Sequence, residues 1–147
     1  MVAGNLSDVP ANDTYVGGSF VIEWFEAGDS AHKCGEVVEA ESTGNAGEVI
    51  VCSTDGIPFA VLGLQADLDI DTDVTEGLSY MYYLLHAGTI LRIPHDETAE
   101  TGIRGEACIR SAAVGGSVYK GTTAGVVVGY LVRDDTTCAS SWLVLIT

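Results

Sequence analysis

Short runs of β-branched and aromatic residues recur along this chain, and turn residues separate them at intervals of about 8–12 residues. No window of the chain has the 3.6-residue apolar period of an amphipathic helix. The one apolar stretch for which a helix is an alternative, residues 77–87, is rich in aromatic residues and has glycine close to both ends, which favours a strand. The pattern predicts an all-β fold, either a β-barrel or a sandwich. The predicted strands cover residues 19–25, 36–41, 48–52, 59–64, 80–85, 89–93, 106–110, 117–120, 125–133 and 142–146.

The length of 147 residues is typical of one compact domain. Hydrophobic residues make up 47% of the chain, which is enough for a sizeable core without a metal or a disulfide. The runs 36–41 and 48–52 enclose a loop that contains Gly44 and Asn45, and they predict a β-hairpin.

Residues 1–17 are predicted to form an extended N-terminal arm, followed by the all-β domain at 18–147. The arm is polar and shows neither the helical nor the strand period, so it cannot bury a face by itself. We therefore expect a partner to hold it. The predicted interface residues are Leu6, Val9, Pro10, Tyr15 and Val16.

The charge balance limits the choice of partners. The chain has 21 Asp and Glu residues against six Lys and Arg, a net charge of −15. The negative electrostatic potential of such a chain repels nucleic acid and anionic membranes, so neither is an expected partner. No apolar stretch reaches the length of a transmembrane helix, and the first residues lack the cationic and apolar regions of a signal peptide. We expect the protein to remain in the compartment where it is made.

Four cysteines lie far apart in the sequence, and none belongs to a CxxC pair, which argues against a zinc site. Buried free thiols are the first interpretation. The alternative is a disulfide, for which Cys34 and Cys52 are the best candidates because they flank the predicted hairpin.

The most acidic segment of the chain is residues 67–73. Asp69, Asp71 and Asp73 alternate as at the start of a calcium-binding EF-hand loop, but Val74 replaces the required glycine and Tyr80 the final glutamate. We interpret the segment as a solvated acidic edge, with a cation site of moderate affinity as the alternative.

No combination of residues predicts an enzyme or a cofactor site. His32, His86 and the group His95-Asp96-Glu97 are accompanied by no nucleophile motif, and surface or capping roles are expected for these histidines. The glycine-rich stretches lack the features of a phosphate-binding loop. Core packing and a subunit interface together account for the aromatic residues Trp24, Phe25, Tyr80, Tyr82 and Tyr83.

The order of glycine-flanked elements resembles that of the small capsid decoration, or cement, proteins of tailed viruses. The similarity covers roughly residues 18–147. It rests on Cys34 to Val38, the turn Ser53 to Gly56, Ala87 to Ile90, Gly102 to Ala107 and the closing Gly125 to Val132.

This resemblance implies a β-barrel-like module with an N-terminal arm on the capsid exterior of a virion. Its partners would be the major capsid protein and further copies of itself, as a homotrimer. Two alternatives remain open: a subunit of an extracellular filament or surface layer that assembles by strand complementation, and a carbohydrate- or calcium-binding β-module.

Overall fold

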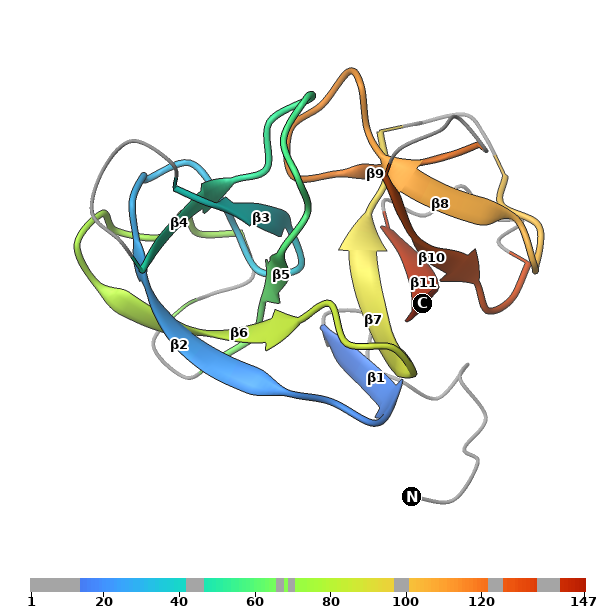
Figure 1. The fold of residues 1–147 in the computed structure, drawn as a ribbon, viewed down its shortest axis with the longest axis horizontal. Helices are drawn as coiled ribbons and strands as arrows, with labels where there is room; N and C mark the ends of the chain where they lie inside the picture. The colour runs from blue at the N-terminus through green and yellow to red at the C-terminus, as the bar shows by residue number, and fades with distance from the viewer. Residues whose placement is uncertain are drawn as a thin grey trace.

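The computed structural model describes residues 14–41, 47–65, 68, 71–96, 101–121, 126–134 and 141–147. These residues form β-strands and no helix, which confirms the all-β prediction (Figure 1). The strands are β1 (Tyr15–Gly18), β2 (Ile22–Ala27), β3 (Val37–Ala40), β4 (Glu48–Val51), β5 (Ala60–Leu62), β6 (Ser79–Leu84), β7 (Thr89–Pro94), β8 (Ala107–Arg110), β9 (Val118–Lys120), β10 (Val127–Leu131) and β11 (Ser141–Ile146). No helix among the described residues is long and apolar enough to cross a membrane.

Strands β2 to β6 close into a barrel in the order β2-β4-β3-β5-β6. The predicted hairpin is present, because β3 and β4 pair antiparallel with Val38 opposite Val51. Segment 77–87, the one stretch weighed as a helix, contains β6, which pairs antiparallel with β2. The barrel is closed by a short parallel contact between β2 and β4, at Glu26 and Ala27 of β2.

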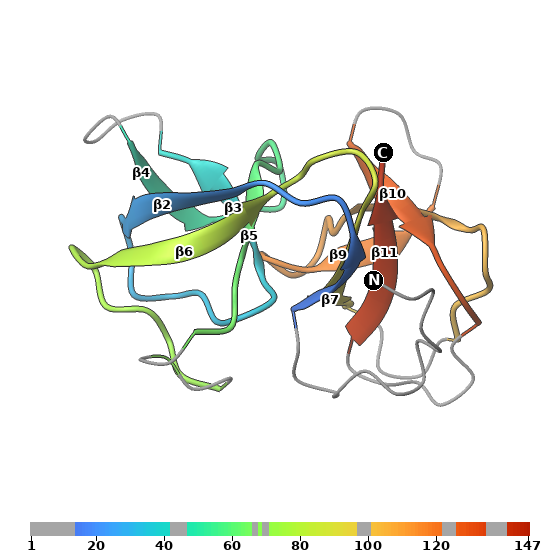
Figure 2. The same ribbon diagram turned by 90° about the horizontal axis from the view of Figure 1, so that it is seen from below.

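The remaining strands form a six-stranded sheet in the order β1-β7-β11-β10-β8-β9. Strand β11 lies in the interior of this sheet and pairs antiparallel with β7 on one side and β10 on the other. The barrel and the sheet occupy opposite halves of the molecule in both ribbon views (Figures 1 and 2). The fold is thus a barrel with an additional sheet.

Strand β1 corrects the predicted boundary of the arm. Tyr15 to Gly18 pair antiparallel with β7, so the last residues assigned to the arm belong to the sheet. Gly18 has a φ of 80°, and a Cβ atom there would overlap the carbonyl oxygen of Gly88. The run is too short to show a strand period, and its stability comes from pairing with a segment about 70 residues away. Residues 1–13 lie outside the described residues.

Two apolar clusters form the core. One fills the barrel and includes Val38, Val49, Leu62 and Tyr82. The other lies between the barrel and the inner face of the sheet, where Val37, Cys52 and Val61 join residues of β7, β8, β10 and β11. Because the second cluster takes side chains from both halves, it packs the barrel against the sheet.

Candidate functional site

Strand β2 leaves most of one edge without a neighbouring strand among the described residues. On one side it pairs with β6 from Ile22 to Glu26. On the other side it pairs with β4 only at Glu26 and Ala27. The edge from Ile22 to Phe25 is therefore open. An open strand edge presents main-chain donors and acceptors to which another extended segment can pair.

Exposed apolar side chains lie in β2 and on the two residues that precede it. The exposed fraction is 47% for Phe20, 41% for Ile22 and 65% for Trp24. Neighbouring large apolar side chains that remain exposed are typical of protein–protein interfaces. We define the β2 edge patch as Phe20, Val21, Ile22 and Trp24.

A row of aromatic rings continues the patch toward β1. The ring centroid of Phe20 lies 4.9 Å from that of Tyr15 and 6.0 Å from that of Tyr83. Tyr15 and Tyr83 stack with their centroids 5.6 Å apart. Tyr15 was a predicted interface residue, and the structure places it beside the patch. Val16 is 6% exposed, so its side chain belongs to the core. The other predicted interface residues, Leu6, Val9 and Pro10, lie outside the described residues.

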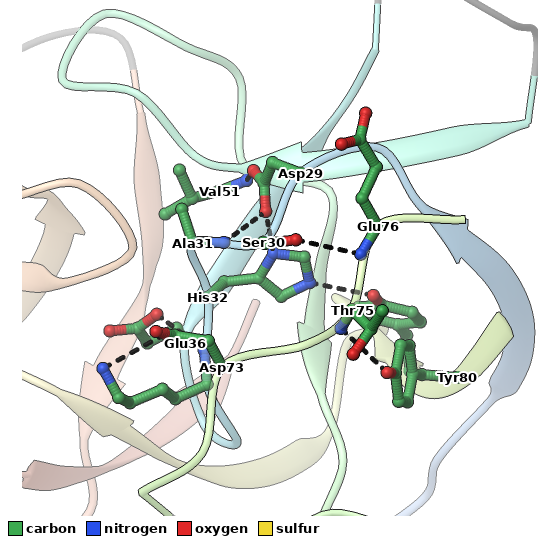
Figure 3. Close-up of polar contacts among 12 residues, drawn as sticks. Asp29, Ser30, Ala31, His32, Glu36, Val51, Asp73, Thr75, Glu76 and Tyr80 are labelled. Atoms are coloured by element: carbon green, nitrogen blue, oxygen red, sulfur yellow. Dashed lines mark hydrogen bonds and ion pairs between the residues drawn. The ribbon is translucent and has the colours of Figure 1, made fainter. Parts of the chain in front are cut away.

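A polar network around the buried His32 fixes the turn that follows β2 (Figure 3). The Nδ1 of His32 lies 2.8 Å from Oδ1 of Asp29, and its Nε2 lies 2.9 Å from the hydroxyl of Tyr82. The carboxylate of Asp29 also accepts the N–H groups of Ala31 and Val51, at 3.0 and 2.7 Å. The network therefore ties this turn to β4 and β6.

The protonation states in this network follow from burial. Burial lowers the pKa of His32, and the hydrogen bond and charge of Asp29 offset this only in part. Burial by itself raises the pKa of Asp29, but the hydrogen bonds from Val51, Ala31 and His32 outweigh it and leave this pKa below its ordinary value. A neutral imidazole then donates from Nδ1 to Asp29 and accepts at Nε2 from the hydroxyl of Tyr82.

Both lowered pKa values act on stability in the same direction. A group whose pKa is lower in the folded state stabilises the fold above its unfolded-state pKa, and that contribution is lost as the pH falls through the folded-state value. For His32 the loss begins below about pH 6.5, and for Asp29 it begins below about pH 4.

Replacing Asp29 with Asn is expected to lower the free energy of unfolding by about 2 kcal/mol, because it removes the charge that strengthens the hydrogen bonds from Val51, Ala31 and His32. Chemical denaturation at pH 7 measures the change. Asp73→Asn is the matched control. Asp73 forms an ion pair with Lys33 at 3.2 Å, and both side chains are more than 40% exposed, so it should change stability by less than about 1 kcal/mol. Equal effects of the two substitutions would contradict a structural role for the network.

The network was missed by the sequence analysis, which expected surface or capping histidines. His32 is 0% exposed and His95 is 9% exposed, with its ring stacked on Trp142 at 4.2 Å, whereas His86 is exposed as expected. Both ring nitrogens of His32 are engaged, so it is placed to hold the fold and not to meet a substrate. The sequence feature that could have indicated this network is Asp29, which lies three residues before His32 in a Gly-Asp-Ser turn.

The predicted acidic segment is only partly described. Asp71 and Asp73 are both exposed, and Asp73 pairs with Lys33, whereas Asp69 lies outside the described residues. Within the part of the chain that the structure describes, no group of three His, Cys, Asp or Glu side chains is close enough to hold a metal ion.

The candidate disulfide between Cys34 and Cys52 is absent from the structure, in which both residues are free thiols. The physical reason is that they belong to different clusters: Cys34 packs against the barrel interior, and Cys52 against the sheet. Burial raises the pKa of Cys52 and of Cys108 to about 12, and the nearby acids Glu39 and Glu106 add to this. Both thiols are therefore protonated and unreactive at neutral pH.

The sheet offers a second surface feature. A shallow pocket of about 500 Å³ lies at the ends of β8, β9 and β10. Ala107 and Tyr130 are cross-strand neighbours in this pocket, and Tyr130 is 42% exposed. We define the β8–β10 pocket by its lining residues Gly105, Glu106, Ala107, Lys120, Gly121 and Tyr130.

No protein-family model matches this sequence, and no curated protein matches it. Solved structures do share the fold. One similar chain belongs to the capsid of Myoviridae phage XM1, with a TM-score of 0.62 and 13% sequence identity. The match covers 99% of this chain and 93% of that chain. At this identity the similarity concerns the fold alone.

Proposed function

We propose that this chain is a structural protein of a tailed-phage virion, a decoration subunit that binds the exterior of the capsid and stabilises the head. The observation that carries the proposal is the shared fold over 99% of the chain with a chain of a phage capsid. The exposed β2 edge patch gives independent support, because an open apolar strand edge is suited to binding another protein surface.

In this role the major capsid protein and further copies of the chain, as a homotrimer, are the proposed partners. The barrel and the sheet pack together through a shared apolar cluster and present the contact surfaces. The predicted arm is proposed to pair with a neighbouring subunit. Each contact can be weak, because repetition over a capsid lattice multiplies the effect of individual contacts.

The direct test is binding to phage heads. Purified chain is incubated with heads of its own phage from which the outer proteins have been removed, and cryo-electron microscopy locates any added density. We expect ordered density on the outer surface and heads that resist heat or dilution better than bare heads. Failure to bind at saturating concentration would contradict the proposed function.

A truncated chain that lacks residues 1–13 tests the arm. The cut precedes Tyr15, so β1 and its pairing with β7 remain intact. We expect head binding to weaken by roughly tenfold or more, a loss of about 1.4 kcal/mol, with an unchanged circular dichroism spectrum. A full-length variant with Leu6, Val9 and Pro10 replaced by Ser is the control: it keeps the length of the arm and removes only these predicted contact side chains. Undiminished binding by both variants would show that the arm is not the attachment device.

The open edge of β2 also favours a second candidate, the subunit of an extracellular filament that assembles by strand complementation. The two candidates differ in the product of assembly. Open-ended fibres formed by purified chain, with no affinity for heads, would favour the filament.

A further inference from the structure

The open edge of β2 carries main-chain groups that can bind another strand. The N–H of Leu84 donates to the carbonyl of Val21 at 2.9 Å, and the pairing with β6 continues along β2 without a shift of register. The odd-numbered residues of β2 therefore face β6, because main-chain groups alternate between the two edges of a strand. The even-numbered Gly28 donates instead to β4, at 2.8 Å. The N–H and C=O groups of Ile22 and Trp24 thus point to the side on which no described strand pairs with them.

The side chains of the same two residues are apolar and exposed. By strand alternation Ile22 and Trp24 share one face of β2, whereas Phe25 packs against the barrel cluster on the other face. A strand added at this edge would cover both exposed side chains with its own. Main-chain hydrogen bonds and apolar contacts would therefore form together, as in other cases of strand addition.

The charge of the barrel is almost entirely negative. Residues 20–88, which contain its strands, hold 13 Asp and Glu against a single Lys or Arg, Lys33, for a net charge of −12. Lys33 is engaged in an ion pair with an acid of the same stretch. Strand β2 itself carries the exposed Glu23 and Glu26, and Glu26 lies opposite Glu48 of β4 in the strand register. The open edge therefore lies in a negative electrostatic potential.

This charge selects among the strands that could pair with the edge. A second β2 edge would place Glu23 and Glu26 of one copy against those of another. Residues 1–13 hold Asp8 and Asp13 and no Lys or Arg, so this segment does not supply positive charge through its side chains. Like charges on neighbouring strands oppose both pairings. An extended segment that contains Lys or Arg is attracted to the same edge.

We infer that the open edge of β2 binds an extended, positively charged segment of another protein, which adds to the barrel as a strand beside Ile22 and Trp24. In the proposed function this segment belongs to the major capsid protein, and the inference rests on that function only for this identity. The acidic side chains of β2 then have two effects. They oppose pairing between the β2 edges of two copies, and they attract the partner strand.

The test uses short peptides in place of the partner strand. The cationic probe is the capped heptapeptide Lys-Val-Lys-Val-Lys-Val-Lys, its acidic counterpart has Glu in place of Lys, and a third peptide has the sequence of residues 1–13. The chain has two tryptophans, and Trp142 is buried, so a saturable blue shift of emission from the full-length chain reports the burial of Trp24. We expect the cationic peptide to bind at least roughly tenfold more tightly than the other two.

Two N-methylated peptides separate strand pairing from the attraction of charge alone. Both keep every lysine charge of the cationic probe. One carries methyl groups on the amide nitrogens of its valines, and the other on those of its inner lysines. Because alternate N–H groups of a strand point to opposite edges, only one of the two sets of methyl groups removes the donors that meet β2. We expect one peptide to bind like the cationic probe and the other at least roughly tenfold more weakly.

Variants of the chain locate the bound peptide. Trp24→Ala, measured by calorimetry because it lacks the fluorescent reporter, should bind the cationic probe at least roughly tenfold more weakly. Glu23→Gln combined with Glu26→Gln should weaken binding by roughly fivefold or more. Asp55→Asn combined with Asp71→Asn is the matched control, since it removes two exposed carboxylates of the barrel outside β2, and it should weaken binding by less than about twofold. Unchanged near-ultraviolet circular dichroism confirms that each charge variant is folded.

Three results would overturn the inference: equal binding of the two N-methylated peptides, tighter binding of the peptide 1–13 than of the cationic probe, or no change of Trp24 emission with the cationic probe. Binding to phage heads is measured separately. A chain that decorates heads but gives any of these results keeps the proposed function and loses the strand site. A chain that binds the cationic probe as expected but does not bind heads keeps the strand site and loses the proposed function.

Discussion

Trp142→Ala should lower the free energy of unfolding by about 4 kcal/mol, a large fraction of the stability of a domain of this size. Trp142 is 1% exposed in β11, and its ring stacks on that of His95 with the centroids 4.2 Å apart. It also belongs to the cluster that joins the barrel to the sheet, so the cavity would open between the two halves. Thermal denaturation is expected to show a Tm about 10 °C lower.

The second tryptophan provides the control for this prediction. Trp24 is 65% exposed, and Trp24→Ala should change the free energy of unfolding by less than about 0.5 kcal/mol. The two variants therefore separate the buried tryptophan from the exposed one: Trp142→Ala should lose stability, and Trp24→Ala should keep it. Similar Tm values for both variants would show that the assigned core is wrong.

Gly129→Ala is expected to cost at least about 3 kcal/mol, because the added Cβ has no space. It would overlap the carbonyl oxygen of Leu145 and lie 2.8 Å from the carbonyl carbon of that residue. These are backbone atoms of the neighbouring strand, so the contact can be relieved only by moving β10 away from β11. Urea denaturation measures the loss.

Gly121→Ala is the matched glycine control. A Cβ at Gly121 meets Cδ1 of Ile109 at 3.4 Å, an ordinary contact with a movable side chain. Its stability should remain within about 0.5 kcal/mol of the wild type. A wild-type midpoint for Gly129→Ala would contradict the close approach of β10 and β11.

The strands that the sequence predicted correctly are those whose signal is local. Residues 48–52 and 142–146 are short Val, Ile and Leu runs next to turn residues, and they correspond to β4 and β11. The partners of these strands could not be predicted in the same way. The parallel pairing of β2 with β4 and the position of β11 between β7 and β10 depend on contacts between distant segments. Strand β1 was missed for the same reason.

The candidate site was predictable only in part. Alternation along the strands correctly indicated that the aromatic residues divide between core and surface, with Tyr80 and Tyr82 buried and Trp24 exposed. It could not indicate that β4 pairs with only the last residues of β2, which is what opens the edge. His32 appeared isolated because one of its two partners, Tyr82, lies 50 residues away in the sequence.

The interior position of β11 in the sheet has a consequence for the order of folding during synthesis. Strands β2 to β6 are consecutive in the chain, so the barrel can close while later segments are still on the ribosome. The sheet has no such freedom, since β7 and β10 are joined only through β11, which follows all the other described strands in the chain. A nascent chain would thus expose a closed barrel, with the β2 edge patch on its surface, before the strands of the sheet have come together.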